Sequence, residues 1–271
     1  MENKLAEYKN YLLARNLSTT YCDTVKLWLA YMEKNKIETI TQEVVTQFFI
    51  TNSKYSVETC NKFVKACRSY YTAFLQVPKE RNEWYKIKLM KVARKIPEYL
   101  QEEDIENAKK YLITYHSNKT SPDKIRAILD FLYYSGCRKM EFINLKRADF
   151  NLEENTAKLY GKGDKERIIC YPNKVKKEIE LYFSQENEEN NAFNISEDKL
   201  KYMIKLIQKH LGKKVYIHLF RHSMARNLIY NRGMDINTVS KLLGHASLTT
   251  TMIYVNPDEQ TIKANYKKLV G

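Results

Sequence analysis

Residues 242–255 read LLGHASLTTTMIYV, and residues 218–222 read HLFRH. In the second string, His218 and Arg221 are three positions apart, so on a helix they project from one face. An imidazole beside a guanidinium suits a phosphate, because Arg supplies a planar, permanent charge and His carries a proton near neutral pH. The two strings therefore predict an anion-binding surface in the C-terminal third of the chain.

Each residue of this region has a plainer explanation when it is taken alone. His218 and His222 are four apart, as two zinc ligands on a helix would be, but the Glu of an H-E-x-x-H site is missing, so we expect no metal site. His116 and His210 are expected to be structural. Tyr254 is one of 21 tyrosines. The functional signal therefore lies in the combination of residues.

Two further strings complete that combination. SGCRKMEFINL occupies residues 135–145, and GKGDKER occupies residues 161–167. Together the four strings closely resemble motifs of the tyrosine recombinase family, which includes the phage integrases and the Xer and Cre-like enzymes. All six motif positions are present in the family's order, and they span nearly the whole second half of the chain.

The resemblance implies a role for each matching residue. Glu141 matches the acid that supports the first arginine, and the implied catalytic set is Arg138, Lys162, His218, Arg221, His245 and Tyr254. The family forms a 3′-phosphotyrosyl intermediate and a free 5′-hydroxyl, which then attacks a partner strand. Site-specific recombination of DNA is accordingly the expected function.

These residue types suit that reaction. A phenol with a pKa near ~10 is a poor nucleophile when neutral, so Tyr254 needs a base, for which His218 is the candidate. The two arginines would stabilise the charge of the transition state, and His245 would donate a further hydrogen bond. Lys162 would protonate the departing 5′ oxygen. The covalent link conserves the bond energy, so we expect no ATP, no metal and no other cofactor.

Composition agrees with a DNA partner. The net charge is +14, with 17 Lys and Arg against 9 Asp and Glu in residues 1–95, and 29 against 23 in the rest. Both parts are basic, as expected if both touch one polyanion, although many Lys-rich chains bind nothing acidic.

The sequence also predicts a reduced, cytoplasmic protein without a membrane span. It has five cysteines without a CxxC pair, no apolar run of ~20 residues, and a charged N-terminus.

The first part of the chain is expected to be a helical, core DNA-binding (SAM-like) domain, residues 1–85. Apolar residues recur at helical spacing in 21–32 and 63–74, and residues 1–95 contain no Gly. Pro78 is expected to close this helical section. A linker, residues 86–98, follows, and its basic side chains are candidates for contact with phosphates: Lys86, Lys88, Lys91, Arg94 and Lys95. A solvated charged face is the alternative.

The catalytic domain is expected over residues 99–271. Helices are predicted from near Gln101, over 123–134 with a C-cap at Ser135-Gly136, and again from Asn173. Two β-prone runs, 156–160 and 167–171, flank a glycine-rich tip and predict a hairpin. The expected fold class is therefore mainly α with a small β-sheet.

Assembly and target remain open at this stage. The family implies a tetramer on double-stranded DNA with a short inverted-repeat site, in which the tail, residues 255–271, docks on a neighbouring subunit; a helix packed on its own domain is the alternative. The two-domain length favours a Xer-like resolvase of chromosome or plasmid dimers over an integrase of a mobile element. Two different functions compete less strongly with recombination: that of a type IB topoisomerase, and that of a DNA-binding factor with a decayed catalytic domain.

Overall fold

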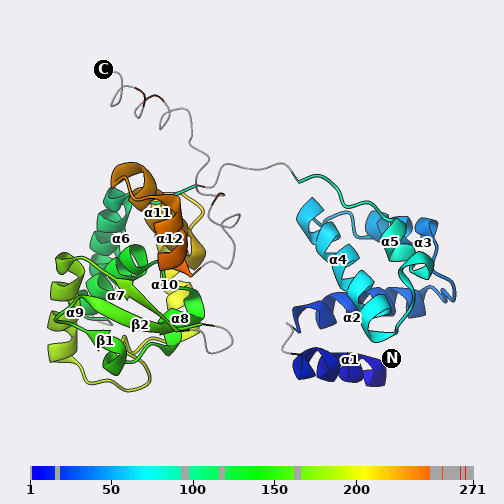
Figure 1. The fold of residues 1–271 in the computed structure, drawn as a ribbon, viewed down its shortest axis with the longest axis horizontal. Coiled ribbons are helices and arrows are strands. Elements are labelled where there is room, and N and C mark those ends of the chain that lie inside the picture. Colours follow the sequence, from blue (N-terminus) through cyan, green and yellow to red (C-terminus); the bar gives the residue numbers. More distant parts are fainter. Residues whose placement is uncertain are drawn as a thin grey trace. The chain divides into compact units, whose positions relative to one another are not determined.

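The computed structural model describes residues 2–15, 19–92, 98–115, 120–161 and 166–244, together with Met252, Lys263 and Tyr266. The chain divides into two compact units, residues 1–95 and 96–271. Within the described segments the protein is mostly helical and has one three-stranded sheet (Figure 1). This confirms the predicted fold class.

The first unit is entirely helical in its described residues. Its elements are α1 (Glu2–Ala14), α2 (Thr20–Lys34), α3 (Gln42–Thr51), α4 (Val57–Ser69), the π-helical turn η1 (Tyr70–Phe74), the 3₁₀ turn η2 (Lys79–Arg81) and α5 (Glu83–Lys86). Thr41 and Ser56 cap α3 and α4, since each hydroxyl accepts a hydrogen bond of 3.3 Å from the backbone N–H three residues later. Local sequence therefore fixes where these helices begin.

Pro78 does not close the helical section, so that expectation was wrong. It is followed by η2 and α5. Trp84 of α5 has no exposed surface, and its ring packs edge-on against that of Trp28, with centroids 4.8 Å apart. A buried indole stabilises a small core strongly, which is why the chain turns back onto the helices after the proline.

The segment after α5 is held against α4. Arg68 donates hydrogen bonds to the carbonyl oxygens of Trp84 (2.9 Å) and Ile87 (2.6 Å). The Asn61 side chain pairs with both backbone groups of Met90, at 2.8 and 2.9 Å. The first part of the predicted linker is therefore fastened to the first unit as far as Met90.

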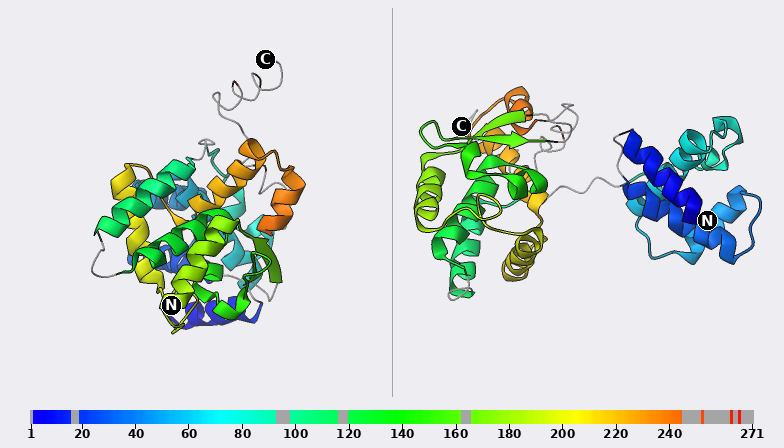
Figure 2. Two further views of the ribbon diagram at one scale, coloured as in Figure 1. Left: turned by 90° about the vertical axis from the view of Figure 1, so that its left-hand side faces the viewer. Right: turned by 90° about the horizontal axis from the view of Figure 1, so that it is seen from below.

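The second unit combines helices with the sheet. Its elements are α6 (Glu102–Tyr115), α7 (Pro122–Ser135), α8 (Lys139–Asn144), η3 (Arg147–Asp149), β1 (Phe150–Asn151), β2 (Thr156–Tyr160), β3 (Glu166–Cys170), α9 (Asn173–Gln185), α10 (Glu197–Leu211), α11 (Ile217–Arg226), η4 (Asn227–Asn231) and α12 (Ile236–Leu243). The strands are antiparallel in the order β1-β2-β3, with Ala157 facing Phe150 and Ile169. In the right-hand view of Figure 2 the hairpin lies along one side of this unit.

The central helix of the second unit is α7. Because most of its side chains are apolar, neighbouring elements cover it on most sides. Ile125, Leu129 and Phe131 have no exposed surface. Asp130, also buried, accepts hydrogen bonds of 2.9 and 3.0 Å from Lys109 of α6, so the charge of each is compensated. Neighbouring elements therefore pack against α7 on most of its sides.

The end of α7 forms a tight corner. Gly136 has φ +57°, and a Cβ there would lie 3.0 Å from the Leu243 side chain and 3.1 Å from Met224. Both the left-handed backbone and the lack of space require glycine. The corner brings α7, α11 and α12 together at one place, and the predicted C-cap at this position is confirmed.

Two further findings concern the cysteines and the length of the apolar helices. All five cysteines lie in described segments and are free thiols. Among the described residues, no helix has both the length and the apolar character that a bilayer crossing requires.

Candidate active site

The first arginine motif forms the start of α8. Arg138 is the residue that precedes the helix, and Glu141 lies in its first turn. One carboxylate oxygen of Glu141 accepts the backbone N–H of Arg138 at 2.7 Å, and the other accepts Nη1 of the same residue at 2.7 Å. The acid therefore caps the helix and orients the arginine side chain at the same time.

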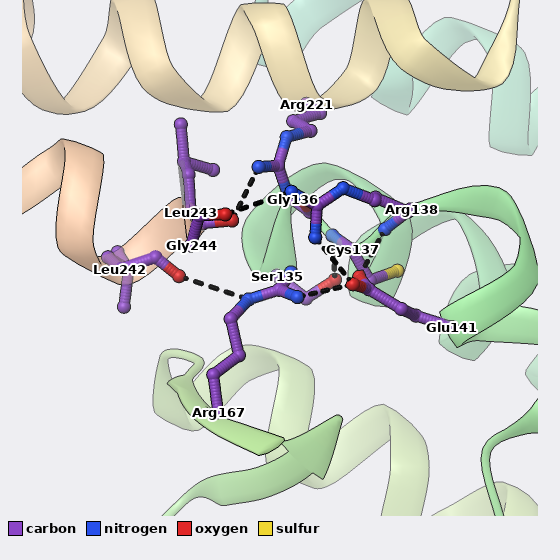
Figure 3. Close-up of polar contacts among 10 residues, drawn as sticks. All are labelled: Ser135, Gly136, Cys137, Arg138, Glu141, Arg167, Arg221, Leu242, Leu243 and Gly244. Atoms are coloured by element: carbon purple, nitrogen blue, oxygen red, sulfur yellow. Dashed lines mark hydrogen bonds and ion pairs between the residues drawn. The ribbon is translucent and has the colours of Figure 1, made fainter. Parts of the chain in front are cut away.

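Glu141 also binds a second arginine. Arg167 of β3 donates from Nη1 to the carboxylate oxygen that receives Nη1 of Arg138 (Figure 3). Burial alone would raise the pKa of Glu141, but the hydrogen bonds from Arg167 and from the backbone and side chain of Arg138 outweigh it and lower the pKa to about 2. Glu141 is thus a permanently charged anchor at neutral pH.

The C-terminal end of α12 meets three guanidinium groups. The carbonyl oxygens of its last two residues and of the glycine that follows them each accept a hydrogen bond from a different arginine (Figure 3). The pairs are Leu242 with Arg167 Nε (3.3 Å), Leu243 with Arg221 Nη2, and Gly244 with Arg138 Nη2 (2.9 Å). Because helix C-termini carry partial negative charge and unpaired carbonyls, cations are stabilising there. The arginines therefore fix the point at which the LLGH string begins.

Arg221 lies beneath this surface. Only 1% of its surface is exposed, and besides Leu243 it binds the carbonyl oxygen of Gly136 at 2.7 Å. It therefore connects α11 to the corner after α7 and to the end of α12. The guanidinium is held in place by backbone groups and not by a flexible surface contact.

His218 and Arg138 share an open cavity. Its wall includes Glu141, and Gly161 at the end of β2, but Arg221 does not line it. About 39% of the Arg138 side chain is exposed, so its guanidinium is accessible from the cavity. Arg138, which precedes α8, and His218 of α11 thus face the same cavity.

The surroundings of the two histidines of α11 favour the neutral form. Partial loss of hydration lowers the pKa of His218, and the charges of Arg221 and Arg138 lower it further. Burial and the nearby His218 lower the pKa of His222 to about 4. A neutral imidazole can accept a proton at pH 7. In the segments that the structure describes, no group of three His, Cys, Asp or Glu side chains could hold a metal ion.

Three motif residues lie outside the described residues: Lys162, His245 and Tyr254. The residues that precede the first two in the chain are described. Gly161 lines the cavity, and Gly244 is bound by Arg138. Of the residues next to these motif positions, Gly161 therefore shares the cavity with Arg138, and Gly244 is hydrogen-bonded to it.

The basic stretch after α5 is partly described. Lys86, Lys88 and Lys91 are exposed, and Lys86 forms an ion pair of 2.6 Å with Glu83. Arg94 and Lys95 lie outside the described residues. The described lysines are thus accessible to a ligand, with Lys86 already paired within its own helix.

Arg167 is the residue that sequence reasoning missed. It stands at the end of the GKGDKER string, but we drew only Lys162 from that string. Its partner Glu141 is 26 positions away and Leu242 is 75 away. The local sequence of a β-strand gives no sign of such partners.

Comparison with known proteins shows the family of the chain. The model of the phage integrase family matches residues 98–261. The chain belongs to this family. It is 27% identical over 288 residues to the tyrosine recombinase XerC of Listeria welshimeri, an alignment that covers 98% of this chain and 94% of the relative. The protein is accordingly a tyrosine-type recombinase, an enzyme of site-specific DNA recombination.

Solved structures of recombinases share its fold. The crystal structure of XerA recombinase matches with a TM-score of 0.55 and 25% identity, and the match covers 99% of each chain. XerH bound to its palindromic difH substrate matches with a TM-score of 0.67 and 22% identity over 93% of this chain and 81% of that one. The likeness to XerH concerns the fold alone. The prediction of a tyrosine recombinase is confirmed.

Proposed function

We propose that this recombinase breaks a DNA strand by attack of Tyr254 on the scissile phosphate. The observation that carries the proposal is the shared cavity, in which an accessible arginine, Arg138, stands beside a neutral histidine, His218. The phenol oxygen of Tyr254 forms a bond to phosphorus, and its proton passes to His218. The 5′ oxygen leaves with a proton from Lys162, and the 3′ phosphate stays on the tyrosine.

The two arginines have different parts in charge stabilisation. Arg138 reaches the cavity directly, and Arg221 fixes the backbone behind it. His245 follows Gly244, whose carbonyl oxygen Arg138 binds, and donates the further hydrogen bond to the phosphate. Loss of one such donor typically costs on the order of 2.7–4 kcal/mol in the barrier. A free 5′-hydroxyl then attacks the phosphotyrosine of a partner strand, which releases Tyr254.

The biological role proposed is resolution of chromosome or plasmid dimers in the cytoplasm. Similarity to XerC over 94% of that protein's length supports this role. Integration of a mobile element is the second candidate, because the catalytic step is the same in both. We further propose that the helical first unit and the basic stretch contact double-stranded DNA at a short inverted-repeat site.

Assembly into a tetramer on DNA is also proposed, with the tail, residues 255–271, docking on a neighbouring subunit. Tyr266 supports this arrangement, because 65% of its surface is exposed. In the sequence it lies four positions after Ile262 and three before Leu269, which is the apolar spacing of an amphipathic helix. Tyr is among the residue types that are enriched in the interfaces between proteins.

Covalent trapping tests the proposed chemistry. In cells, sequencing the DNA attached to the enzyme identifies the target site, and a nicked suicide substrate carrying that site then traps the intermediate. We expect a DNA adduct with the native chain and none with Tyr254→Phe, while site binding is retained. An adduct at native level in Tyr254→Phe would exclude Tyr254 as the nucleophile. Relaxation of supercoiled DNA that lacks the site would favour topoisomerase activity instead.

A further inference from the structure

We propose that Arg167 is a positioning residue for strand cleavage. It joins the acid that orients Arg138 to the end of the helix that leads to His245 and Tyr254. The inference rests on the proposed function of Tyr254 and Arg138. None of the six motif positions includes Arg167, and it does not line the cavity shared by Arg138 and His218. It therefore acts on the phosphate through its neighbours.

Arg167 makes two contacts from one rigid guanidinium. Nη1 binds the Glu141 carboxylate, and Nε binds the carbonyl oxygen of Leu242 at 3.3 Å. Only 13% of the Arg167 side chain and 3% of the Glu141 side chain are exposed. Because the fork of a guanidinium is planar, these contacts fix the direction of both partners relative to β3.

The contacts close a ring of residues. Arg138 binds Glu141, Glu141 binds Arg167, and Arg167 binds the carbonyl oxygen of Leu242. Two positions further along the chain, the carbonyl oxygen of Gly244 accepts a hydrogen bond from Arg138 (Figure 3). Arg138 and Arg167 share one carboxylate oxygen of Glu141. Removal of Arg167 would leave the carboxylate with Arg138 alone and release one carbonyl of α12. Arg138 would then lose the fixed direction that its side chain has in this ring.

Gly244 gives independent evidence that Arg167 packs on the end of α12. A Cβ built at Gly244 would lie 2.9 Å from Cδ of Arg167. Nη2 of Arg167 is buried and has no hydrogen-bond partner among the described residues. The side chain is thus enclosed at the junction of β3, α8 and α12. An enclosed side chain of this kind suits the positioning of its neighbours better than contact with solvent or substrate.

Cleavage of two substrates separates positioning from general destabilisation. One suicide substrate carries the ordinary phosphodiester, and the other carries a methylphosphonate at the scissile position. The methylphosphonate is neutral, so the charge of Arg138 is needed much less. We would measure single-turnover cleavage by the native chain and by Arg138→Ala, Arg167→Ala and the double variant, with site binding and urea unfolding recorded for each.

We expect Arg167→Ala to bind its site normally and to cleave the phosphodiester about 100-fold more slowly, since a small misplacement of a catalytic group has that effect. On the methylphosphonate, Arg138→Ala and Arg167→Ala should both come within a few-fold of the native rate. The double variant should be no slower on the phosphodiester than Arg138→Ala. Arg126→Ala is the matched control, because it removes a guanidinium that is paired with Asp123 at 2.7 Å on α7.

Two results would overturn the inference: native cleavage by Arg167→Ala, or a defect of equal size on both substrates. If Arg167→Ala fails to fold, Arg167→Lys takes its place in the same comparison, because it keeps the charge and loses the fork. These outcomes are distinct from failure of the proposed function. That failure appears in the native chain itself, as an adduct that does not form or does not require Tyr254.

Discussion

The Nη2 atom of Arg138 donates a 2.9 Å hydrogen bond to the carbonyl oxygen of Gly244, across 106 positions of sequence. The bond joins the start of α8 to the end of α12. It places the guanidinium that is accessible from the cavity next to the residue before His245. The first arginine motif and the beginning of the LLGH string are therefore held together by a hydrogen bond to the backbone.

Histidine titration checks the proposed base. Because partial burial and then the charges of Arg221 and Arg138 lower the pKa of His218, it should titrate below its usual value near ~6.5. Cleavage should therefore be constant across neutral pH and decline only as His218 is protonated below that value. By NMR, Arg138→Ala should raise the pKa of His218, because a repelling positive charge is gone.

Lys139→Ala is the control for this titration, since it removes a neighbouring charge that forms an ion pair of 2.6 Å with Glu197. The His218 resonance is assigned by its loss in His218→Gln. A native His218 that titrates above 6.5, or an Arg138→Ala variant with an unchanged His218, would contradict this account.

Gly244→Ala and Gly212→Ala form a matched pair. Both glycines end a helix with positive φ, +65° and +63°, so Ala introduces a backbone strain of about 1–2 kcal/mol at either. Nothing lies within 4 Å of a Cβ at Gly212, whereas at Gly244 it would meet Arg167. We expect Gly244→Ala to lower the free energy of unfolding by more than Gly212→Ala does, and to slow cleavage, which Gly212→Ala should leave unchanged. If the two variants had equal effects on urea unfolding and on cleavage of the suicide substrate, the contact with Arg167 would be unimportant.

The exposed lysines after α5 should set part of the salt dependence of DNA binding. If Lys88 and Lys91 each contact a phosphate, each Ala variant should make the plot of log affinity against log salt shallower by about 0.9. Lys86→Ala should change the slope less, because Lys86 is paired with Glu83. Lys177→Ala on α9, also exposed, is the control. If the Lys88 and Lys91 variants both gave the slope of the native protein, these lysines would face solvent and would not contact phosphates.

Deletion of Lys263–Gly271 checks the proposed tail contact. We expect a truncated protein to bind a single site normally but to assemble paired sites poorly, because an apolar contact between subunits is lost. Tyr266→Ala should weaken assembly in the same direction without shortening the chain, since its ring is exposed in the isolated subunit. Light scattering with DNA measures assembly. Native assembly and recombination by the truncated protein would instead indicate a tail that packs on its own domain.

Local features of the fold were predictable because neighbouring residues cause them. The helix that ends at Ser135-Gly136 was expected from its C-cap signal, and the strand Thr156–Tyr160 from its β-prone residues. Pro78 misled the prediction because the proline signals a local end to a helix, whereas the chain's return is driven by burial of Trp84 against Trp28. That contact spans 56 positions and has no local signal.

For the candidate site, the sequence by itself determined the identity of the motif residues and the local pairing of Arg138 with Glu141, which are only three positions apart. Only the tertiary structure decided that Arg221 is buried, that Arg167 belongs to the same cluster, and that three arginines hold the end of α12. The physical reason is that backbone carbonyls carry no side-chain signature. Any residue type at Leu242 or Leu243 offers the same acceptor, so folding alone determines which carbonyl a distant guanidinium meets.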